Sequence, residues 1–332
     1  MRRAEGRQTW GIYVHIPYCV KKCAYCDFVS VPSAQRGAEM EDYAAALTAE
    51  ILREVPPLRA RWGDAATIYV GGGTPTALPA PLLTGLLRTL TAAAGEPLEC
   101  SVEANPGTVD EVYLGALRAA GANRLSLGVQ SFDDELLRAV GRIHTAEEAE
   151  RAFHAARAAG FGNISIDLMY GLPGQTLDRL RRSAAAAAAL APEHLSVYGL
   201  TIEEGTPFAA MQAAGRLNLP TEDAAEEMYD FLMAELPARG YARYEIANFA
   251  RRGFESRHNR GYWHMTPYLG LGAAAHGYVD GVRWANEADT PAYIRAMQAG
   301  ACVRSPEDGA RTRERAMEEY AFLALRTAEG ID

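Results

Sequence analysis

The stretch GIYVHIPYCVKKCAYCDFVS, residues 11–30, joins an apolar run typical of a β-strand to a loop with three cysteines. Residues 11–17 are predicted to form the strand, and Cys19, Cys23 and Cys26 follow with the spacing C-x3-C-x2-C. Three thiols this close together favour a metal centre over disulfide bonds. Because most metal sites use four ligands, the stretch raises the question of what occupies the fourth position.

Strand-like and helix-like segments alternate through the first two thirds of the chain. Further strands are predicted at 66–73, 98–105, 124–131, 163–171 and 194–202. Helices are predicted between them at 39–55, 80–94, 109–120, 145–159 and 176–190. Such repeated strand–helix units predict a parallel sheet with right-handed crossovers. The pattern favours an α/β fold in which six strand–helix units form a barrel of the TIM type, and leaves a doubly wound sheet open as the alternative.

The alternation stops after about residue 204, which predicts a change of architecture there. A helix is expected at 221–238 and another at 311–327, separated by Gly- and Ala-rich segments. We therefore expect a barrel core over 1–204, with the cysteine loop at 15–30. We expect a smaller α+β C-terminal region over 205–332, packed on the barrel.

Composition limits the classes of partner. The net charge of -9 argues against nucleic acid, because phosphate binding requires a basic face. No apolar run reaches 18 residues, and the N-terminus lacks the apolar core of a secretory signal, so a cytoplasmic location without a membrane span is expected. Transient contact with membrane-bound partners stays open. The only lysines, Lys21 and Lys22, lie in the cysteine loop, and a solvated loop is their simplest explanation.

The three loop cysteines fit an iron–sulfur cluster better than zinc. A zinc ribbon needs a second cysteine pair, whereas Cys100 and Cys302 are isolated and are expected to pack as small apolar residues. A [4Fe–4S] cluster takes one thiolate per iron. Three cysteines therefore leave one iron open to an exogenous chelating ligand.

With this spacing after a first strand, the loop resembles that of the radical S-adenosylmethionine (SAM) superfamily. In that superfamily the amino and carboxylate groups of SAM chelate the fourth iron. The six strand–helix units match its fold, so the resemblance implies a partial (β/α)6 barrel of the TIM type. Several motifs also resemble the oxygen-independent coproporphyrinogen III oxidase group: YVHIPYC (13–19), GGGTPT (71–76), EANP (103–106), LGVQSF (127–132), GRIHT (141–145) and IDLMYGLPGQT (166–176).

The resemblance implies where SAM would bind. Glycines at 71–73 allow a close backbone approach to a ligand, although a tight turn between strand and helix explains them as well. Polar residues at later strand ends supply acceptors and one fixed cation for the ligand, and each of them alone could have a general structural role. The implied SAM site consists of Tyr13, Tyr25, Gly72, Gly73, Thr74, Glu103, Gln130, Arg142 and Asp167.

Two features separate the branches of the oxidase group. The oxidases resemble this chain but extend the motif to C-x3-C-x2-C-x-C, whereas Phe28 occupies the place of that last cysteine here. The segment HNRGYW (258–263) resembles the H-N-x-x-Y-W signature of the heme-chaperone branch, the HemW proteins. His258 is a candidate axial heme ligand, and Tyr262 and Trp263 could contact the porphyrin. Buried hydrogen bonds and core packing explain these residues equally well.

The sequence therefore predicts a heme-binding radical-SAM-type protein that passes heme to acceptor proteins and carries a [4Fe–4S] cluster and SAM. Two alternatives stay open: an enzyme that oxidatively decarboxylates coproporphyrinogen III to protoporphyrinogen IX, and a radical SAM enzyme with another substrate. No residue is assigned a catalytic role. His264 and His276 are further heme candidates, each more simply explained as structural. Members of the branch usually continue beyond the point that corresponds to Asp332, so the chain is expected to be a short member or a truncated sequence.

Overall fold

The computed structural model describes residues 8–301, 303–306 and 312–331. Six parallel strands form its centre: β1 (Gly11–Ile16), β4 (Thr67–Gly72), β5 (Glu99–Ala104), β6 (Arg124–Gln130), β7 (Ile164–Tyr170) and β8 (His194–Gly199). They lie side by side in chain order. A doubly wound sheet would reverse its strand order near the middle, so this alternative is excluded and the partial barrel is confirmed.

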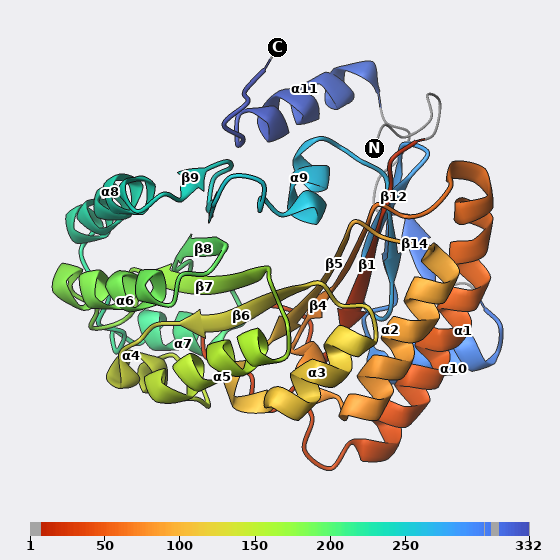
Figure 1. The fold of residues 1–332 in the computed structure, drawn as a ribbon, viewed down its shortest axis with the longest axis horizontal. Coiled ribbons are helices and arrows are strands. Elements are labelled where there is room, and N and C mark those ends of the chain that lie inside the picture. The colour runs from red at the N-terminus through yellow and green to blue at the C-terminus, as the bar shows by residue number, and fades with distance from the viewer. Residues whose placement is uncertain (1–7, 302, 307–311, 332) are drawn as a thin grey trace.

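Helices cover the outer, convex face of this curved sheet (Figure 1). They are α1 (Gly37–Trp62), α2 (Ala80–Ala94), α3 (Glu111–Ala119), α4 (Asp134–Ala139), α5 (Ala146–Ala158) and α6 (Leu177–Ala189). Two short 3-10 turns, η1 (Pro75–Ala77) and η2 (Pro106–Thr108), follow β4 and β5. The helix predicted to stop at residue 55 continues through Pro56 and Pro57 to Trp62, whose ring packs against Trp10 at 6.3 Å.

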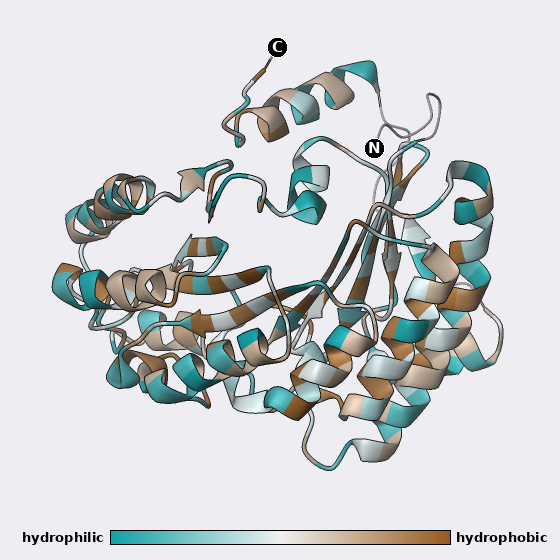
Figure 2. Ribbon diagram, viewed as in Figure 1, coloured by the Kyte–Doolittle hydropathy of each residue, from teal (hydrophilic) through white to brown (hydrophobic). Residues whose placement is uncertain are grey.

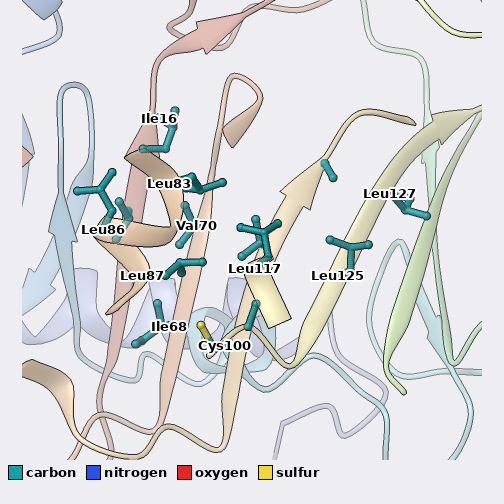
Figure 3. Packing of buried hydrophobic residues seen from close by; sticks show 14 of the residues in the cluster. Ile16, Ile68, Val70, Leu83, Leu86, Leu87, Cys100, Leu117, Leu125 and Leu127 are labelled. Carbon is teal, nitrogen blue, oxygen red and sulfur yellow. The ribbon is translucent and has the colours of Figure 1, made fainter. Parts of the chain in front are cut away.

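The main hydrophobic core lies between the strands and these helices (Figures 2 and 3). Alternate strand residues such as Ile68 and Val70 point outward and pack against Leu83 and Leu87 of α2. Cys100 is fully buried in this cluster, which confirms its predicted packing role, whereas Cys302 lies outside the described residues. The other residues of each strand face the interior of the barrel, and many of them are polar.

Residues after 204 add to the same sheet at both of its edges. Beyond β8 come β10 (Asn248–Ala250) and β9 (Ala242–Arg243), and beyond β1 come β11 (Tyr268–Leu271), β12 (His276–Val279), β13 (Val282–Asn286) and β14 (Arg304–Pro306). Among these, β11 runs parallel to β1, and the other neighbouring pairs beyond the six central strands are antiparallel. The C-terminal region is thus continuous with the barrel sheet, and the division at 204 stays a prediction.

The remaining helices are α7 (Pro207–Ala213), α8 (Glu222–Ala238), α9 (Arg257–Trp263), α10 (Thr290–Gln298) and α11 (Arg313–Ala324). The short helix α9 closes the barrel at the amino ends of the strands. Glu99, the first residue of β5, accepts hydrogen bonds from the backbone N–H groups of Arg257 (2.7 Å) and His258 (3.1 Å). Within the part of the chain that the structure describes, no helix is both long and apolar enough to span a membrane.

Candidate functional site

The three loop cysteines lie at the carboxyl ends of the strands, between β1 and α1. The loop is closed by a short parallel pairing of β2 (Tyr18–Cys19) with β3 (Val31–Pro32). All three thiols are free, with Cys19 buried and Cys23 and Cys26 partly buried. Folding therefore gathers three thiols on one closed loop at the open end of the barrel.

The arrangement of these thiols fits a cluster rather than a single ion. Among the described residues, no three His, Cys, Asp or Glu side chains converge on one metal ion. A [4Fe–4S] cluster does not require this, because each thiolate binds a different iron. Donors already point at the sulfurs: Thr74 Oγ1 lies 3.5 Å from Cys19 Sγ, and Arg142 Nη1 lies 3.6 Å from Cys23 Sγ. Such donors stabilise thiolates, so the residues fit the cluster.

His15 holds the second half of the cysteine loop in place. Its Nε2 lies 2.9 Å from the Val29 carbonyl oxygen, which can only accept, so Nε2 carries the proton. Its Nδ1 therefore accepts from the Tyr13 hydroxyl at 3.0 Å. Tyr13 is not among the residues that line the neighbouring cavity, and it acts on the loop through His15.

A cavity of about 360 Å³ opens beside the cysteine loop and extends into the barrel as far as Asn259 of α9. It is within the size range of small-molecule sites in proteins. All the residues predicted to bind SAM except Tyr13 line it together with the three cysteines: Tyr25, Gly72, Gly73, Thr74, Glu103, Gln130, Arg142 and Asp167. The structure therefore brings these residues together, and their contacts with SAM stay a prediction.

The glycine turn after β4 packs tightly against the cysteine loop. Gly72 has φ +111°, and a Cβ there would come within 2.7 Å of the His15 ring. A Cβ at Gly73 would lie 2.8 Å from the Tyr18 carbonyl oxygen. Backbone hydrogen bonds from Gly73 to Ile16 and from Thr74 to Tyr18 complete this contact. Glycine is thus required at this turn by the loop itself, independently of any ligand.

Two carboxylates face the interior of the cavity. Glu103 accepts from the Tyr69 hydroxyl at 2.7 Å and from the Gly72 backbone N–H at 3.3 Å, and burial raises its pKa to about 7. Asp167 accepts from Ser126 at 3.2 Å, and burial also raises its pKa. Removing a carboxylate from water disfavours its charged form, and a cationic ligand would restore that form. The part of the cavity beside these two carboxylates therefore suits a cationic group of a ligand, such as a sulfonium or an amine, whereas Arg124 and Arg142 line other parts of the same cavity.

The raised pKa of Glu103 predicts a pH dependence of stability. Between the ordinary value of 4.5 and about 7, the folded protein binds a proton that the unfolded chain does not, so stability falls as pH rises across this window. A shift of this size corresponds to roughly 3 kcal/mol, and we expect about 2 kcal/mol because the carboxylate faces a cavity that water can enter.

Denaturant unfolding of the ligand-free protein at several pH values, with and without Glu103→Gln, would measure this effect. The variant should show the flatter profile between pH 4.5 and 7. Glu111→Gln, at an exposed position of α3, is the matched control and should follow the wild type. Parallel profiles for wild type and Glu103→Gln would contradict the expectation.

Arg142 and Gln130 complete the wall near the cysteines. Arg142 donates to the Gly128 carbonyl oxygen and to Cys23, and its buried Nε has no hydrogen-bond partner among the described residues. Gln130 has φ +71° at an irregularity in the pairing of β6 with β7. A left-handed non-glycine residue costs about 1–3 kcal/mol, and such residues are enriched at ligand sites. Both residues thus show features of a binding site.

The HNRGYW segment lies at the opposite end of the barrel, on α9. His258 is buried against Thr67, whose Oγ1 lies 2.8 Å from its Nδ1, and its Nε2 lies 2.9 Å from the Tyr262 hydroxyl. Burial lowers the pKa of His258 to about 3, and its ring stacks on Tyr69 at 5.2 Å. Both ring nitrogens are used, so heme ligation would require the ring to release one partner.

Of the other heme candidates, Tyr262 lines one pocket together with His258, and Trp263, His264 and His276 do not line it. Trp263 is partly buried and lines neither the cavity at the cysteines nor the pocket that contains His258 and Tyr262. His264 pairs with Glu329 at 3.2 Å, and His276 is exposed at the start of β12.

Sequence reasoning did not identify Arg124. Its side chain is 1% exposed and lines the cavity, and its Nε has no hydrogen-bond partner among the described residues. Arg124 could have been identified from the sequence, because it is a charged residue at the start of a largely apolar predicted strand. His15 was also missed, because its role depends on Val29 in the returning half of the loop.

Comparison with known proteins identifies the class first. The family model described as the radical SAM superfamily matches residues 13–187. This match, the partial barrel and the three-cysteine loop together define a radical SAM protein.

Relatives narrow the assignment. The chain is 40% identical to the heme chaperone HemW of Bacillus subtilis, over 96% of this chain and 84% of that protein. It is also 40% identical to the heme chaperone HemW of Escherichia coli, over 81% of this chain and 70% of the relative. The chain therefore belongs to the HemW family of the radical SAM superfamily, as the sequence motifs predict.

Solved structures confirm the fold. Coproporphyrinogen III oxidase (HemN) from Escherichia coli, a radical SAM enzyme, superposes with a TM-score of 0.83 at 27% identity, and the match covers 97% of this chain and 76% of that one. The architecture of the oxidase therefore extends over nearly all of this chain, including the strands added after the barrel.

Proposed function

We propose that this protein binds heme and transfers it to acceptor proteins. The observation that carries the proposal is the 40% identity, over 96% of the chain, to a protein named as a heme chaperone. Phe28 supports it, because the oxidases that the motif resembles have a cysteine in this position. The three free thiols, which an iron–sulfur cluster needs in reduced form, also favour a reducing compartment such as the cytoplasm.

We further propose that Cys19, Cys23 and Cys26 hold a [4Fe–4S] cluster whose open iron takes SAM. The described residues that line the cavity include no fourth cysteine and no histidine, so an exogenous ligand is needed for the last iron. The acidic side chains of Glu103 and Asp167 suit the cationic parts of SAM, and Arg142 suits its carboxylate. When bound, the cluster and SAM together supply one-electron chemistry.

A heme titration of the anaerobically reconstituted protein tests the proposed function. We expect a Soret band, retention of close to one heme per chain after desalting, and transfer to an apo-acceptor. A protein that has an intact cluster but retains no heme would contradict the proposal. The assignment of heme to His258, Tyr262 and Trp263 is a competing proposal for the location of the site, and variants of His258 test it separately.

The structural likeness to coproporphyrinogen III oxidase favours one second candidate, the oxidase reaction. An anaerobic assay with coproporphyrinogen III, SAM and a reductant distinguishes the two functions. Formation of protoporphyrinogen IX would favour the oxidase, whereas heme retention without product would favour the chaperone. 5′-Deoxyadenosine formed with another small molecule, without heme binding, would favour a different radical SAM reaction.

A further inference from the structure

The cysteine loop exposes three large apolar side chains, one of them at the cavity. Val20 is 47% exposed, Phe28 is 61% exposed and Val29 is 41% exposed. Phe28 also lines the cavity. Exposed apolar side chains close together on one loop are typical of a binding surface.

The loop backbone on both sides of the Phe28 ring is anchored. The Phe28 carbonyl oxygen accepts from Lys22 Nζ at 2.9 Å and from Ser30 Oγ at 3.3 Å. The next carbonyl, that of Val29, accepts from His15. The backbone that carries the exposed ring is therefore held in place by contacts within the cysteine loop and with His15.

Positive charge lies beside this ring. Lys21 and Lys22 are the only lysines in a chain of net charge -9, and both are exposed and line the mouth of the same cavity. Within the described residues neither forms an ion pair, although Asp27 is exposed on the same loop. An ammonium has three N–H donors, and Lys22 uses one of them on Phe28. Free donors of both lysines thus remain for an anionic ligand.

We propose that this loop surface, formed by Val20, Lys21, Lys22, Phe28 and Val29, is the docking site for heme. Heme is a flat, largely apolar macrocycle with two propionate carboxylates on one edge. Phe28 provides an aromatic face for the macrocycle, and the two lysines match the two propionates in number and in sign. The proposal rests on the proposed heme-chaperone function and gives that function a location. It places heme next to the cluster loop and at the far end of the barrel from His258.

This placement of heme also explains why phenylalanine, and not cysteine, is found at position 28. A cysteine there, as in the oxidases that the motif resembles, would offer a small thiol. Phenylalanine offers a large apolar surface that cannot ligate iron. The position that holds a cysteine in the oxidases would therefore hold a side chain for porphyrin docking in this chain.

The test compares heme binding to the reconstituted wild type with binding to Phe28→Ala and to Lys21→Gln/Lys22→Gln, by Soret titration. Each change should weaken heme binding by about tenfold. Heme dimethyl ester, which lacks the propionate charges, should bind the wild type more weakly and should respond less than heme to the lysine change, because for the ester only the contact of Lys22 with the Phe28 carbonyl is lost. Phe28→Ala should weaken the binding of both ligands.

Matched controls separate local effects from general ones. Phe322→Ala removes a comparably exposed ring, at 57%, on α11, and Arg182→Gln/Arg252→Gln removes the same charge at exposed positions elsewhere. Both controls should bind heme like the wild type, and cluster absorbance reports that each variant is folded.

The outcomes are distinct. A wild type that binds no heme would overturn the proposed function and this site with it. Heme binding that is normal in the loop variants but lost in His258→Gln would overturn this site alone. Equal loss in the loop variants and in the two controls would overturn it as well, because the loop would then have no specific part in binding.

Discussion

Replacing any one of Cys19, Cys23 and Cys26 with alanine is expected to abolish assembly of the iron–sulfur cluster. The three thiols lie on one closed loop, and the described lining of the cavity offers no other cysteine or histidine as a substitute. Loss of one thiolate leaves two of the four irons without a protein ligand. Anaerobic reconstitution with iron and sulfide, followed by iron analysis and visible absorption, measures the result.

Cys100→Ala is the matched control for these variants. Its thiol is fully buried among the apolar side chains between β5 and α2, including Ile68 and Leu87 (Figure 3). Removing one buried sulfur atom should lower stability slightly and leave cluster content unchanged. If Cys100→Ala also lost its cluster while remaining folded, the assignment of the ligands would be wrong.

Replacing Glu50 with alanine is expected to destabilise the protein by about 3–5 kcal/mol. Glu50 is fully buried in α1 and joins the first helix to the C-terminal strands. Its carboxylate accepts from Gly272 N at 2.8 Å, from Asn286 Nδ2 at 3.0 Å and from the Tyr293 hydroxyl at 2.7 Å. The alanine variant leaves these donors buried without their acceptor, and chemical denaturation measures the cost.

Leu52→Ala provides the comparison in the same helix, because this side chain is 59% exposed. It should change the free energy of unfolding by no more than about 0.5 kcal/mol. A Glu50→Ala variant as stable as Leu52→Ala would show that the C-terminal strands attach to α1 without this network. A single cooperative transition in the wild type would indicate that barrel and C-terminal region unfold together.

The barrel strands and most of its helices could be predicted from local pattern. All six strand predictions overlap the observed strands, and α2 has the predicted bounds, 80–94. The sequence pattern of the strands was strong, because apolar residues that face the helices alternate along each strand with residues that face the barrel interior, as in β1 and β4. The end of the first helix was missed, since Pro56 and Pro57 normally end a helix, but burial of Val55 and Trp62 stabilises its continuation.

Helix α9 could not be predicted from its own residues. Its first N–H groups are satisfied by Ser256 and by Glu99, which lies 158 residues from Arg257 in the chain. A carboxylate at a helix N-terminus stabilises the helix, and only the folded barrel places it there. The same packing uses both nitrogens of His258, which sequence reasoning left open between a heme ligand and a structural residue.

For this protein, the sequence alone determined the strands, the three-cysteine loop and the family, because these depend on residue type and short spacing. The tertiary structure decided which of the predicted site residues lie close together. It gathered the predicted SAM residues around one cavity, with Tyr13 behind it, and it separated His258 from the cysteine loop by the length of the barrel. It also left Phe28 exposed beside the only two lysines, because backbone contacts from Lys22 and His15 anchor that part of the loop.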